Sequence, residues 1–428
     1  MNEPAINSDL EKTLTHPWRR TLAKERLLAI LLLSLIFAFP AWGQTTLGEV
    51  GAKDTPAVGS QWSFGMETGL GYDSNVFRSP SQPYVDYGAT GNPMVTPVVQ
   101  SGLFTPLKLN IEGGVPAGGN HALLASYRFS GSKYWDKDLS RADQKSHKVR
   151  LGDEWELGRL KKRRNTLYAG VVILSREKLY VDRDSGLEKT VTSGESISER
   201  YSYTGRGAEL LFDQRTTPVR FALWGALESR DYKDPGVVSQ YDHDYRKVGG
   251  DIEFPIADPL SLKVGYEMRE HDYLERPSRD LQGRALKSNP PLHYRYNEAT
   301  ATAHYSPDRS LHIYLQAGRL TRHDQYQGYN NYARDKVRFR VRVRPIQPLR
   351  LKFAVSSWER TYPNAFAFDE PGQGEKHYEG RGMQMRAEYS HRPFLSSFGE
   401  FKTQDTQSTD LRYAYDRYTV TGGIAVEW

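Results

Sequence analysis

Alternation of apolar and polar residues with a period of two runs through nearly all of the chain after residue 61. A clear case alternates apolar side chains with arginines: Val337, Arg338, Phe339, Arg340, Val341, Arg342, Val343 and Arg344. Segments of the same kind begin at residues 62 and 260. A period of two places successive side chains on opposite faces of a β-strand. These segments predict strands, because helical spacing does not fit them.

The strands and their connections form a regular series along the chain. We expect sixteen strands, which begin near residues 62, 103, 121, 146, 166, 203, 219, 245, 260, 294, 311, 335, 349, 380, 394 and 414. Short connections carry turn residues such as Pro, Gly, Asn and Asp. Longer polar connections are expected at residues 73–102, 179–202, 232–244, 272–293, 323–334 and 361–379.

This series indicates a barrel that spans a membrane. Alternating segments of about ten residues, short turns at one end and long loops at the other are typical of transmembrane β-barrels. An even number of strands places both chain ends on the same side of the membrane. We therefore predict an all-β fold, a transmembrane antiparallel up-and-down β-barrel of about 16 strands formed by residues 62–428. A soluble β-sandwich with tyrosines in its core is the alternative.

Composition narrows the chemistry that the chain can perform. The 428 residues include 27 Tyr, 8 Trp and 37 Gly but no Cys, which excludes disulfides, thiolate metal sites and cysteine nucleophiles. Tyr and Trp near the strand ends predict two aromatic girdles at the membrane interfaces. Tyr134, Tyr294 and Tyr362 are expected in the girdle near the long loops, and Trp62 and Tyr168 in the other.

The N-terminal region resembles an export signal in its layout. Residues 1–43 combine a basic lead, an apolar run that Pro40 ends, and the sequence Ala41-Trp42-Gly43. These are the three parts of a cleaved signal peptide. A membrane-anchoring helix is the alternative, although the apolar run is shorter than a spanning helix requires. We expect residues 44–61 to form a short periplasmic segment and the protein to reach the outer membrane of a Gram-negative cell.

Basic side chains on alternate positions predict the lining of the lumen. An arginine that faces lipid costs about 2–4 kcal/mol at mid-bilayer, so the arginine row should face the lumen. The predicted pore-lining residues are Arg338, Arg340, Arg342, Arg344, Arg350, Lys352, Lys263 and Arg269. Acidic partners are expected among Glu267, Glu298, Glu388 and Glu427. A path for anionic solutes and a structural ion-pair network both remain open. The longest connection, residues 73–102, is expected to plug or constrict the lumen.

Other groups of residues give weaker evidence for a metal or catalytic site. Asp182 to Gly186 has part of a calcium-loop pattern, and Asp242-His243-Asp244 could grip a metal, but we predict neither a metal site nor a cofactor. The chain has no Gly-x-Ser-x-Gly elbow and no His-Glu-x-x-His pair. We therefore predict that it is not an enzyme, with His271-Asp272 and His323-Asp324 as the first residues to test. Nucleic-acid binding is not expected of an exported chain.

Two motifs carry a family resemblance. The stretch Gly71, Tyr72, Asp73, Ser74, Asn75, Val76 resembles the first barrel strand of the β-barrel porin family linked to exopolysaccharide export loci. A similar stretch opens the barrel of surface lipoprotein assembly modifiers, but residues 44–61 are too few for the periplasmic helical-repeat domain of those proteins. The C-terminal alternation resembles the signal read by the barrel assembly machinery, through Tyr418, Val420, Ile424, Val426 and Trp428.

The first resemblance implies a conduit for export of a polysaccharide or another polar, anionic solute. Two alternatives are kept. One is a general solute porin, and the other is a non-transport surface protein, of the adhesion or lipoprotein-display type, with a plugged barrel. The expected partners are outer-membrane lipid and lipopolysaccharide, the barrel assembly machinery, and a periplasmic export or polysaccharide synthesis complex.

Overall fold

The computed structural model describes residues 61–428 except 88–89, 161–162, 192, 216–217 and 234–240. These residues belong to one compact unit, Gly43–Trp428. The predicted signal peptide at residues 1–43 lies outside the described residues, as does the predicted periplasmic segment up to residue 60. No helix in the described part of the chain is both long and apolar enough to cross a membrane.

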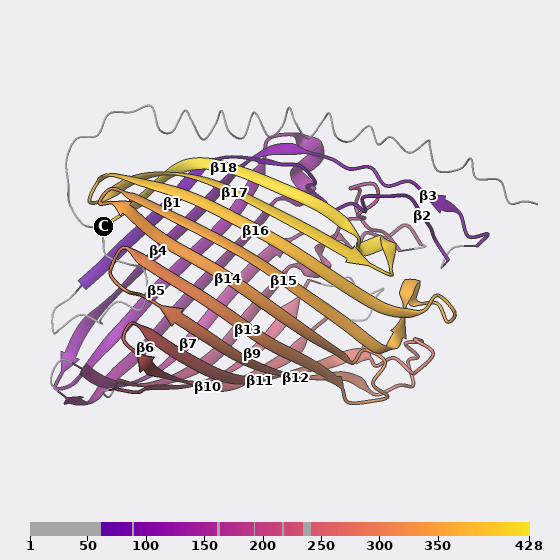
Figure 1. Ribbon diagram of the computed structural model, residues 1–428. Helices are drawn as coiled ribbons and strands as arrows, with labels where there is room; N and C mark the ends of the chain where they lie inside the picture. Colours follow the sequence, from indigo (N-terminus) through magenta and orange to yellow (C-terminus); the bar gives the residue numbers. More distant parts are fainter. Residues whose placement is uncertain (1–60, 88–89, 161–162, 192, 216–217, 234–240) are drawn as a thin grey trace, which may run out of the picture. The chain divides into compact units, whose positions relative to one another are not determined.

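Sixteen of the described strands form one closed antiparallel barrel (Figure 1). Each strand pairs with its neighbours in the chain, and β18 pairs with β1 to close the sheet. The strands are β1 (Gln61–Asp73), β4 (Gly102–Gly118), β5 (His121–Tyr134), β6 (Gln144–Leu160), β7 (Arg163–Lys178), β8 (Tyr203–Arg215), β9 (Arg220–Tyr232), β10 (His243–Ala257), β11 (Leu260–Pro277), β12 (Pro291–Tyr305), β13 (Leu311–Asp324), β14 (Tyr332–Ile346), β15 (Leu349–Phe366), β16 (Glu375–Arg392), β17 (Leu395–Ser408) and β18 (Tyr415–Glu427). The predicted fold and strand number are confirmed.

The connections differ in length at the two ends of the barrel. The short-turn end carries tight turns such as the one from Gly118 to His121, and the C-terminus lies at this end (Figure 1). The long-loop end carries a small sheet and four short 3-10 helices. These elements are β2 (Tyr84–Val85), β3 (Met94–Val95), η1 (Lys137–Ala142), η2 (Ser198–Tyr201), η3 (Ala367–Asp369) and η4 (Leu411–Tyr413).

Several strands reach further at the long-loop end than the sequence predicted. The loop expected at residues 272–293 is shorter, since β11 continues to Pro277 and β12 begins at Pro291. The loop expected at 361–379 is also shorter, because β15 ends at Phe366 and β16 begins at Glu375. These extensions contain buried residues such as Tyr362 and Ala365, which join one hydrophobic cluster, but they lack the regular apolar alternation that marks the rest of each strand.

The register shows which face of the wall points into the lumen. Arg342 pairs with Lys352, and Lys352 pairs with Arg386, so these three side chains share one face. The guanidinium of Arg386 contacts Glu67 of β1 at 2.9 Å although β17 and β18 lie between the two strands. Only the concave side of a closed sheet brings such residues together. This face is therefore the lumen.

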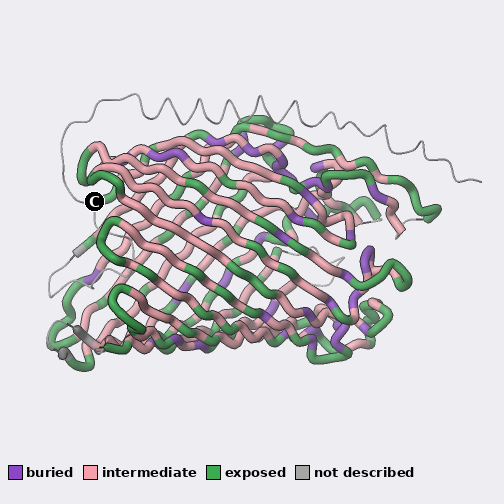
Figure 2. Tube along the Cα trace, viewed as in Figure 1, coloured by how far each residue is buried: buried purple, intermediate pink, exposed green. Residues whose placement is uncertain are grey.

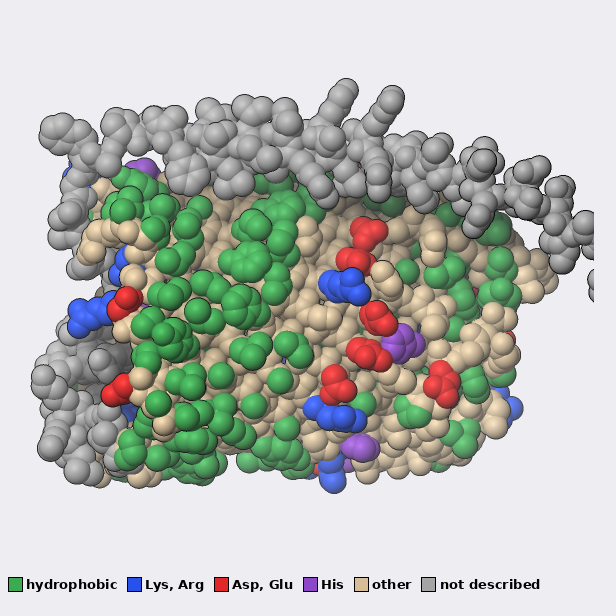
Figure 3. All heavy atoms as spheres, viewed as in Figure 1, with side chains coloured by type: hydrophobic (Ala, Val, Ile, Leu, Met, Phe, Trp, Pro, Cys, Tyr) green, Lys and Arg blue, Asp and Glu red, His purple; other side chains and the backbone are tan. Residues whose placement is uncertain are grey.

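The opposite face is apolar. Val337 and Leu315 face outward and are each 51% exposed. Leu70, Leu107, Leu151, Ile173, Leu210, Leu227, Val248, Val264 and Ile424 are exposed on the same outer face. Figure 3 shows hydrophobic side chains gathered over the short-turn half of the visible wall, with most charged and histidine side chains nearer the long-loop end. Burial is correspondingly sparse along the middle of the strands (Figure 2). Such an outer band suits lipid rather than water.

Candidate functional site

The candidate site is a row of basic side chains on the lumen face of β14. Arg338, Arg340 and Arg342 pair across the sheet with Gln316, Tyr314 and His312 on β13, in that order. On the other side they pair with Ser356, Ala354 and Lys352 on β15. The outward residues between them pair with Leu and Ile on β13 and with Phe and Val on β15. The predicted orientation of the row is confirmed.

The row is longer than the sequence predicted. Alternation continues through Lys336 and Arg334, which pair with Gly318 and Leu320 on the lumen face of β13. The cationic row therefore has six members, Arg334, Lys336, Arg338, Arg340, Arg342 and Arg344. The two extra members were missed because Asp335 stands where the pattern has an apolar residue. Counting alternate positions beyond Val337 would have found them.

Five of the six cations have no acidic partner. Among the residues that the structure describes, no carboxylate forms an ion pair with Arg334, Lys336, Arg338, Arg340 or Arg344. Asp335 faces outward, where it lies 3.7 Å from Arg319. Arg340 lies over the ring of Tyr314 at 4.6 Å, and its Nε is buried without a hydrogen-bond partner. We refer to these six residues as the arginine row.

The other predicted pore-lining cations are paired. Lys263 contacts Asp251 at 2.8 Å, and Arg269 contacts Glu298 at 2.7 Å. Both lie on the lumen side of β11, on the wall away from β15. These cations belong to a local ion-pair network and contribute little net charge to the lumen.

A second paired network lies on the β15 side of the arginine row. Arg350 contacts Glu388 at 3.2 Å, and Lys352 contacts the other oxygen of the same carboxylate at 3.4 Å. Arg386 lies over the ring of Phe398 at 4.0 Å. Glu427, which was expected to be a partner, forms no ion pair with a described residue. The arginine row is thus an excess of positive charge between two balanced regions of the wall.

The first-strand motif has a structural role at the seam of the barrel. Asp73 is fully buried and accepts hydrogen bonds from Tyr134 Oη at 2.8 Å and from Arg417 Nε at 2.9 Å. Asn75 donates from Nδ2 to the carbonyls of Ser79 and Asp416, at 2.9 and 3.0 Å. These contacts tie the end of β1 to β5 and β18.

The rest of the motif supports the same junction. A Cβ on Gly71 would lie 2.5 Å from the ring of Phe104, so this position must stay small. The Ser74 hydroxyl accepts a hydrogen bond from the Tyr418 backbone N–H at 2.8 Å. Tyr72 packs on the ring of Tyr418 at 6.0 Å, and Val76 is buried. The motif closes the barrel and turns the chain.

The C-terminal signal residues face the outside of β18. Tyr418, Val420, Ile424 and Val426 alternate with the lumen face, and Trp428 is 90% exposed. The Trp428 backbone exchanges hydrogen bonds with Phe64 at 2.7 and 2.8 Å. The final residues are therefore held in the wall while their side chains remain accessible from outside.

The prediction of an aromatic girdle at the long loops is wrong for several tyrosines. Tyr134, Tyr294 and Tyr362 are each less than 10% exposed. Tyr294 and Tyr362 lie on the lumen face, where they surround Arg322. At the other end, Trp62 is exposed as expected, but Tyr168 packs toward the lumen against Gly152 and Gly170. Sequence position gives the height of a residue along the barrel, whereas its place in the alternation decides which face it occupies.

The chain connecting β7 to β8 crosses the long-loop end of the barrel. Strands β7 and β15 lie half a turn apart in the closed order. Arg183 in this connection nevertheless lies over Tyr413, between β17 and β18, at 5.1 Å. It also lines one cavity with Arg360 and Tyr362 of β15. Residues 73–102, which were expected to constrict the lumen, also extend over the mouth, since Tyr84 and Tyr87 pack on Phe368 of the β15–β16 connection.

Residues 73–102 support the crossing segment. Tyr84 Oη donates to Asp184 Oδ2 at 2.8 Å, and the Val98 backbone N–H donates to the Asp184 carbonyl at 2.7 Å. Asp182 accepts from the backbone N–H groups of Asp184 and Ser185 and contacts Lys189 at 3.0 Å. Its carboxylate thus folds the loop and pairs with a cation, an arrangement that does not need calcium. Sequence could not show this, because loop length does not fix the direction of a loop.

Neither His-Asp pair from the sequence forms a catalytic dyad. His271 faces the lumen and stacks on His243 at 5.1 Å, whereas Asp272 faces outward. His323 and Asp324 are divided by the wall in the same way, and Asp324 accepts hydrogen bonds from Asn330 in the loop that follows. Neighbouring residues of a strand necessarily point to opposite faces.

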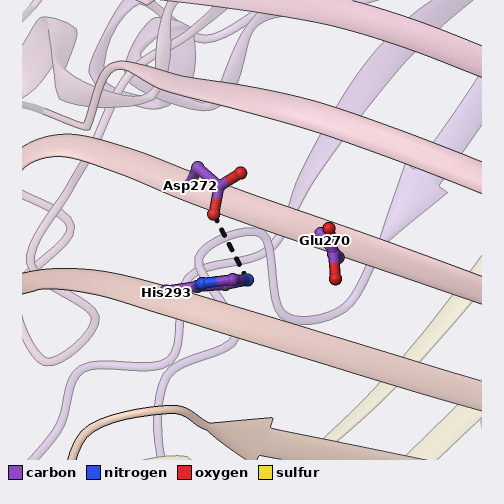
Figure 4. A group of neighbouring side chains, drawn as sticks. All are labelled: Glu270, Asp272 and His293. Atoms are coloured by element: carbon purple, nitrogen blue, oxygen red, sulfur yellow. Dashed lines mark ion pairs between the residues drawn. The ribbon is translucent and has the colours of Figure 1, made fainter.

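One cluster outside the lumen has metal-ligand chemistry. Glu270 and Asp272 on β11 lie near His293 on β12, and their ligand atoms fall within 4.8 Å of one another (Figure 4). Each member already has a partner, because Asp272 contacts His293 at 3.2 Å and Glu270 contacts Arg295 at 2.8 Å. In the Asp242-His243-Asp244 stretch, which could grip a metal but was not predicted to do so, His243 Nδ1 lies 2.9 Å from the Tyr241 carbonyl.

Comparison with known proteins gives only a general likeness. No protein-family model matches the chain, and no characterised protein matches it in sequence. Among solved structures, a loop-deletion mutant of OmpT, an outer membrane protein of Vibrio cholerae, is 7% identical with a TM-score of 0.46. That match covers 86% of this chain and 99% of the other. A mutant of the Rhodopseudomonas blastica porin is 12% identical with a TM-score of 0.38, over 86% of this chain and all of the porin.

Proposed function

We propose that this protein is an outer-membrane β-barrel that conducts anionic, polar solutes, and that its cargo is an acidic polysaccharide leaving the cell. The observation that carries the proposal is the arginine row, which has five cations without acidic partners among the described residues, all in one wall of the lumen. The apolar outer face supports insertion in a membrane. The polysaccharide cargo rests on the resemblance of residues 71–76 to exopolysaccharide-linked porins.

The arrangement fits a path along which a polymer slides. Conduction requires sites that attract the solute but hold it weakly, and several equivalent sites in series satisfy both conditions. Successive members of the row lie about 7 Å apart, since a strand rises about 3.4 Å per residue and alternate residues share a face. An acidic polymer could exchange one guanidinium for the next without complete release.

The decisive measurement is ion selectivity in a planar bilayer. Refolded protein should form stable channels whose reversal potential under a salt gradient shows preference for anions. Acidic oligosaccharides should then interrupt the current more strongly than neutral ones of equal length. A channel selective for cations would contradict the proposal, and equal block by both kinds of sugar would remove the acidic cargo.

A second candidate function is favoured by the crossing segment. The β7–β8 connection reaches the opposite side of the mouth, so the lumen is not open across its full width. The protein could then act at the surface, in adhesion or in display of a lipoprotein, without conducting. A folded barrel that remains electrically silent in the same measurement would support this function. In either case we propose that it has no catalytic activity, and that lipopolysaccharide, the barrel assembly machinery and a periplasmic complex are its partners.

A further inference from the structure

A cavity at the long-loop end is lined by basic and aromatic side chains. Its volume is about 370 Å³, within the range of small-molecule sites. The basic lining residues are Arg183, Arg322, Arg360 and Lys376, and Asp369 is the one acidic residue among those that the structure places around the cavity. The lining therefore carries an excess of positive charge. This cavity does not include any member of the arginine row.

The charges of Lys376 and Asp369 are already balanced. Lys376 contacts Asp369 at 3.1 Å and Asp410 at 3.2 Å. Asp369 is also 3.4 Å from Arg279 and from Arg412. This ionic cluster joins the β11–β12 loop, the β15–β16 loop and η4. It fixes one side of the cavity and leaves no free carboxylate there for the three arginines.

The three arginines lack carboxylate partners among the described residues. Arg322 Nε donates to the Asn330 carbonyl at 2.8 Å, and its guanidinium lies 4.4 Å from the ring centre of Tyr294. Arg360 Nη1 donates to Tyr362 Oη at 3.3 Å, but its Nε is buried without a partner. The guanidinium of Arg183 lies over an aromatic ring. Buried guanidinium nitrogens normally have acceptors, so an anion would complete this site.

Tyrosines form the second part of the lining. Tyr362, Tyr378 and Tyr413 line the cavity as a row of rings with neighbouring centroids 5.8 and 5.8 Å apart, and Tyr332 continues the row outside the lining, 5.3 Å from Tyr362. The hydroxyl of Tyr329, which also lines the cavity, is buried without a partner. Aromatic faces with a few placed polar groups suit a ligand that has a flat apolar surface and hydroxyls.

We infer that this cavity binds one acidic sugar residue, with its carboxylate or phosphate held by Arg183 and Arg360 and its ring against the tyrosine row. A guanidinium fork matches either oxyanion. That the ligand is an anion follows from the cavity alone, whereas its identity as a sugar rests on the proposed function. The site would receive an acidic polymer at the mouth, beyond the arginine row.

Binding to the full-length protein, refolded in detergent, tests the inference by calorimetry. The probes are trigalacturonate for a carboxylate, glucose 1-phosphate for a phosphate, and maltotriose as the neutral control. At least one acidic probe should bind with an affinity about tenfold or more above that of maltotriose. Which acid binds identifies the oxyanion, and either result supports the site. Absence of acidic binding, or equal binding of maltotriose, overturns it.

Variants locate the binding. Arg360→Gln and Arg183→Gln should each weaken the acidic probe about tenfold to a hundredfold, as expected for loss of a charge-assisted hydrogen bond. Arg183 lies in an irregular connection and pairs with no strand, so its variant should fold even if Arg360→Gln does not. Arg319→Gln on the outer wall, where Arg319 lies 3.7 Å from Asp335, is the matched control and should leave the affinity within about twofold. Acid binding that survives both cavity variants would overturn the site.

The two proposals fail separately. Anion-selective conductance with no acid binding would leave the conduit and remove the cavity site. Acid binding by a barrel that does not conduct would leave the cavity site and remove the conduit.

Discussion

Removing charge from the arginine row should reduce anion selectivity by a predictable amount. The perturbation is the triple variant Arg338→Gln, Arg340→Gln and Arg344→Gln, which removes three cations that have no acidic partner among the described residues. An anion about 7 Å from one guanidinium gains about 0.6 kcal/mol in water, by Coulomb's law with a dielectric constant of 80. At 0.1 M salt the Debye length is about 10 Å, so screening reduces this to about 0.3 kcal/mol.

Three such charges together contribute about 0.9 kcal/mol, equivalent to about a fivefold enrichment of anions beside the row. The ratio of anion to cation permeability, from reversal potentials, should therefore fall severalfold in the triple variant. The same three positions changed to Lys keep the charge and should retain wild-type selectivity. Selectivity that is unchanged in the Gln variant, or lost equally in the Lys variant, would refute the assignment of selectivity to this row.

Three other perturbations test the barrel seam, the crossing segment and the ionic cluster at the mouth. Asp73→Ala should lower the free energy of unfolding by about 3–5 kcal/mol in urea, because it removes the fully buried carboxylate that pairs with the half-buried Arg417, whereas Asp335→Ala on the outer wall should cost at most about 1 kcal/mol. Asp182→Ala should loosen the crossing segment and raise mean conductance, and an unchanged current would show that this segment does not limit flow. Although burial raises the pKa of Asp369, its cationic neighbours, with Lys376 foremost, hold that pKa below the usual value. Its stabilising contribution is therefore present at neutral pH and lost as the pH falls through the lowered pKa, below about pH 4. Loss of this charge should loosen the ionic cluster at the mouth. The fluctuations of the single-channel current should therefore increase at pH 3 in wild type, and they should already be large at pH 7 in Asp369→Asn.

The barrel was predictable from the sequence because its wall obeys a local rule. Each strand must face lipid on one side and the lumen on the other, so every strand repeats the same alternation. The residues that follow the rule, such as Val337 and Arg338, were assigned to the correct faces. Strand ends were less accurate where the regular alternation stops, as in the outer part of β11.

The mouth was not predictable, because its contacts join residues that are distant in the sequence. Arg183 contacts Tyr413, and Tyr84 contacts Asp184, although these pairs are 230 and 100 residues apart in the sequence. No spacing rule links such positions. Which basic residues have an acidic partner also depends on the register between strands. Glu388 contacts Arg350 and Lys352, but it contacts none of the five unpaired members of the arginine row.

The absence of acidic partners at five members of the arginine row, among the residues that the structure describes, has a consequence for the lumen itself. Two guanidinium charges about 7 Å apart repel by about 0.6 kcal/mol in water, but by about 12 kcal/mol if the dielectric constant were 4. The three neighbouring repulsions among Arg334, Lys336, Arg338 and Arg340, at the second size, would alone exceed the whole stability of an ordinary domain. The row can therefore persist only if water or anions occupy the space in front of it. Three of the lumen-facing residues that pair with the row on β13 and β15 are small, namely Gly318, Ala354 and Ser356, and they leave space beside it. The repulsion between these cations, which would destabilise a dry interior, thus requires a hydrated path along β14. This requirement holds whether or not the crossing segment closes the mouth.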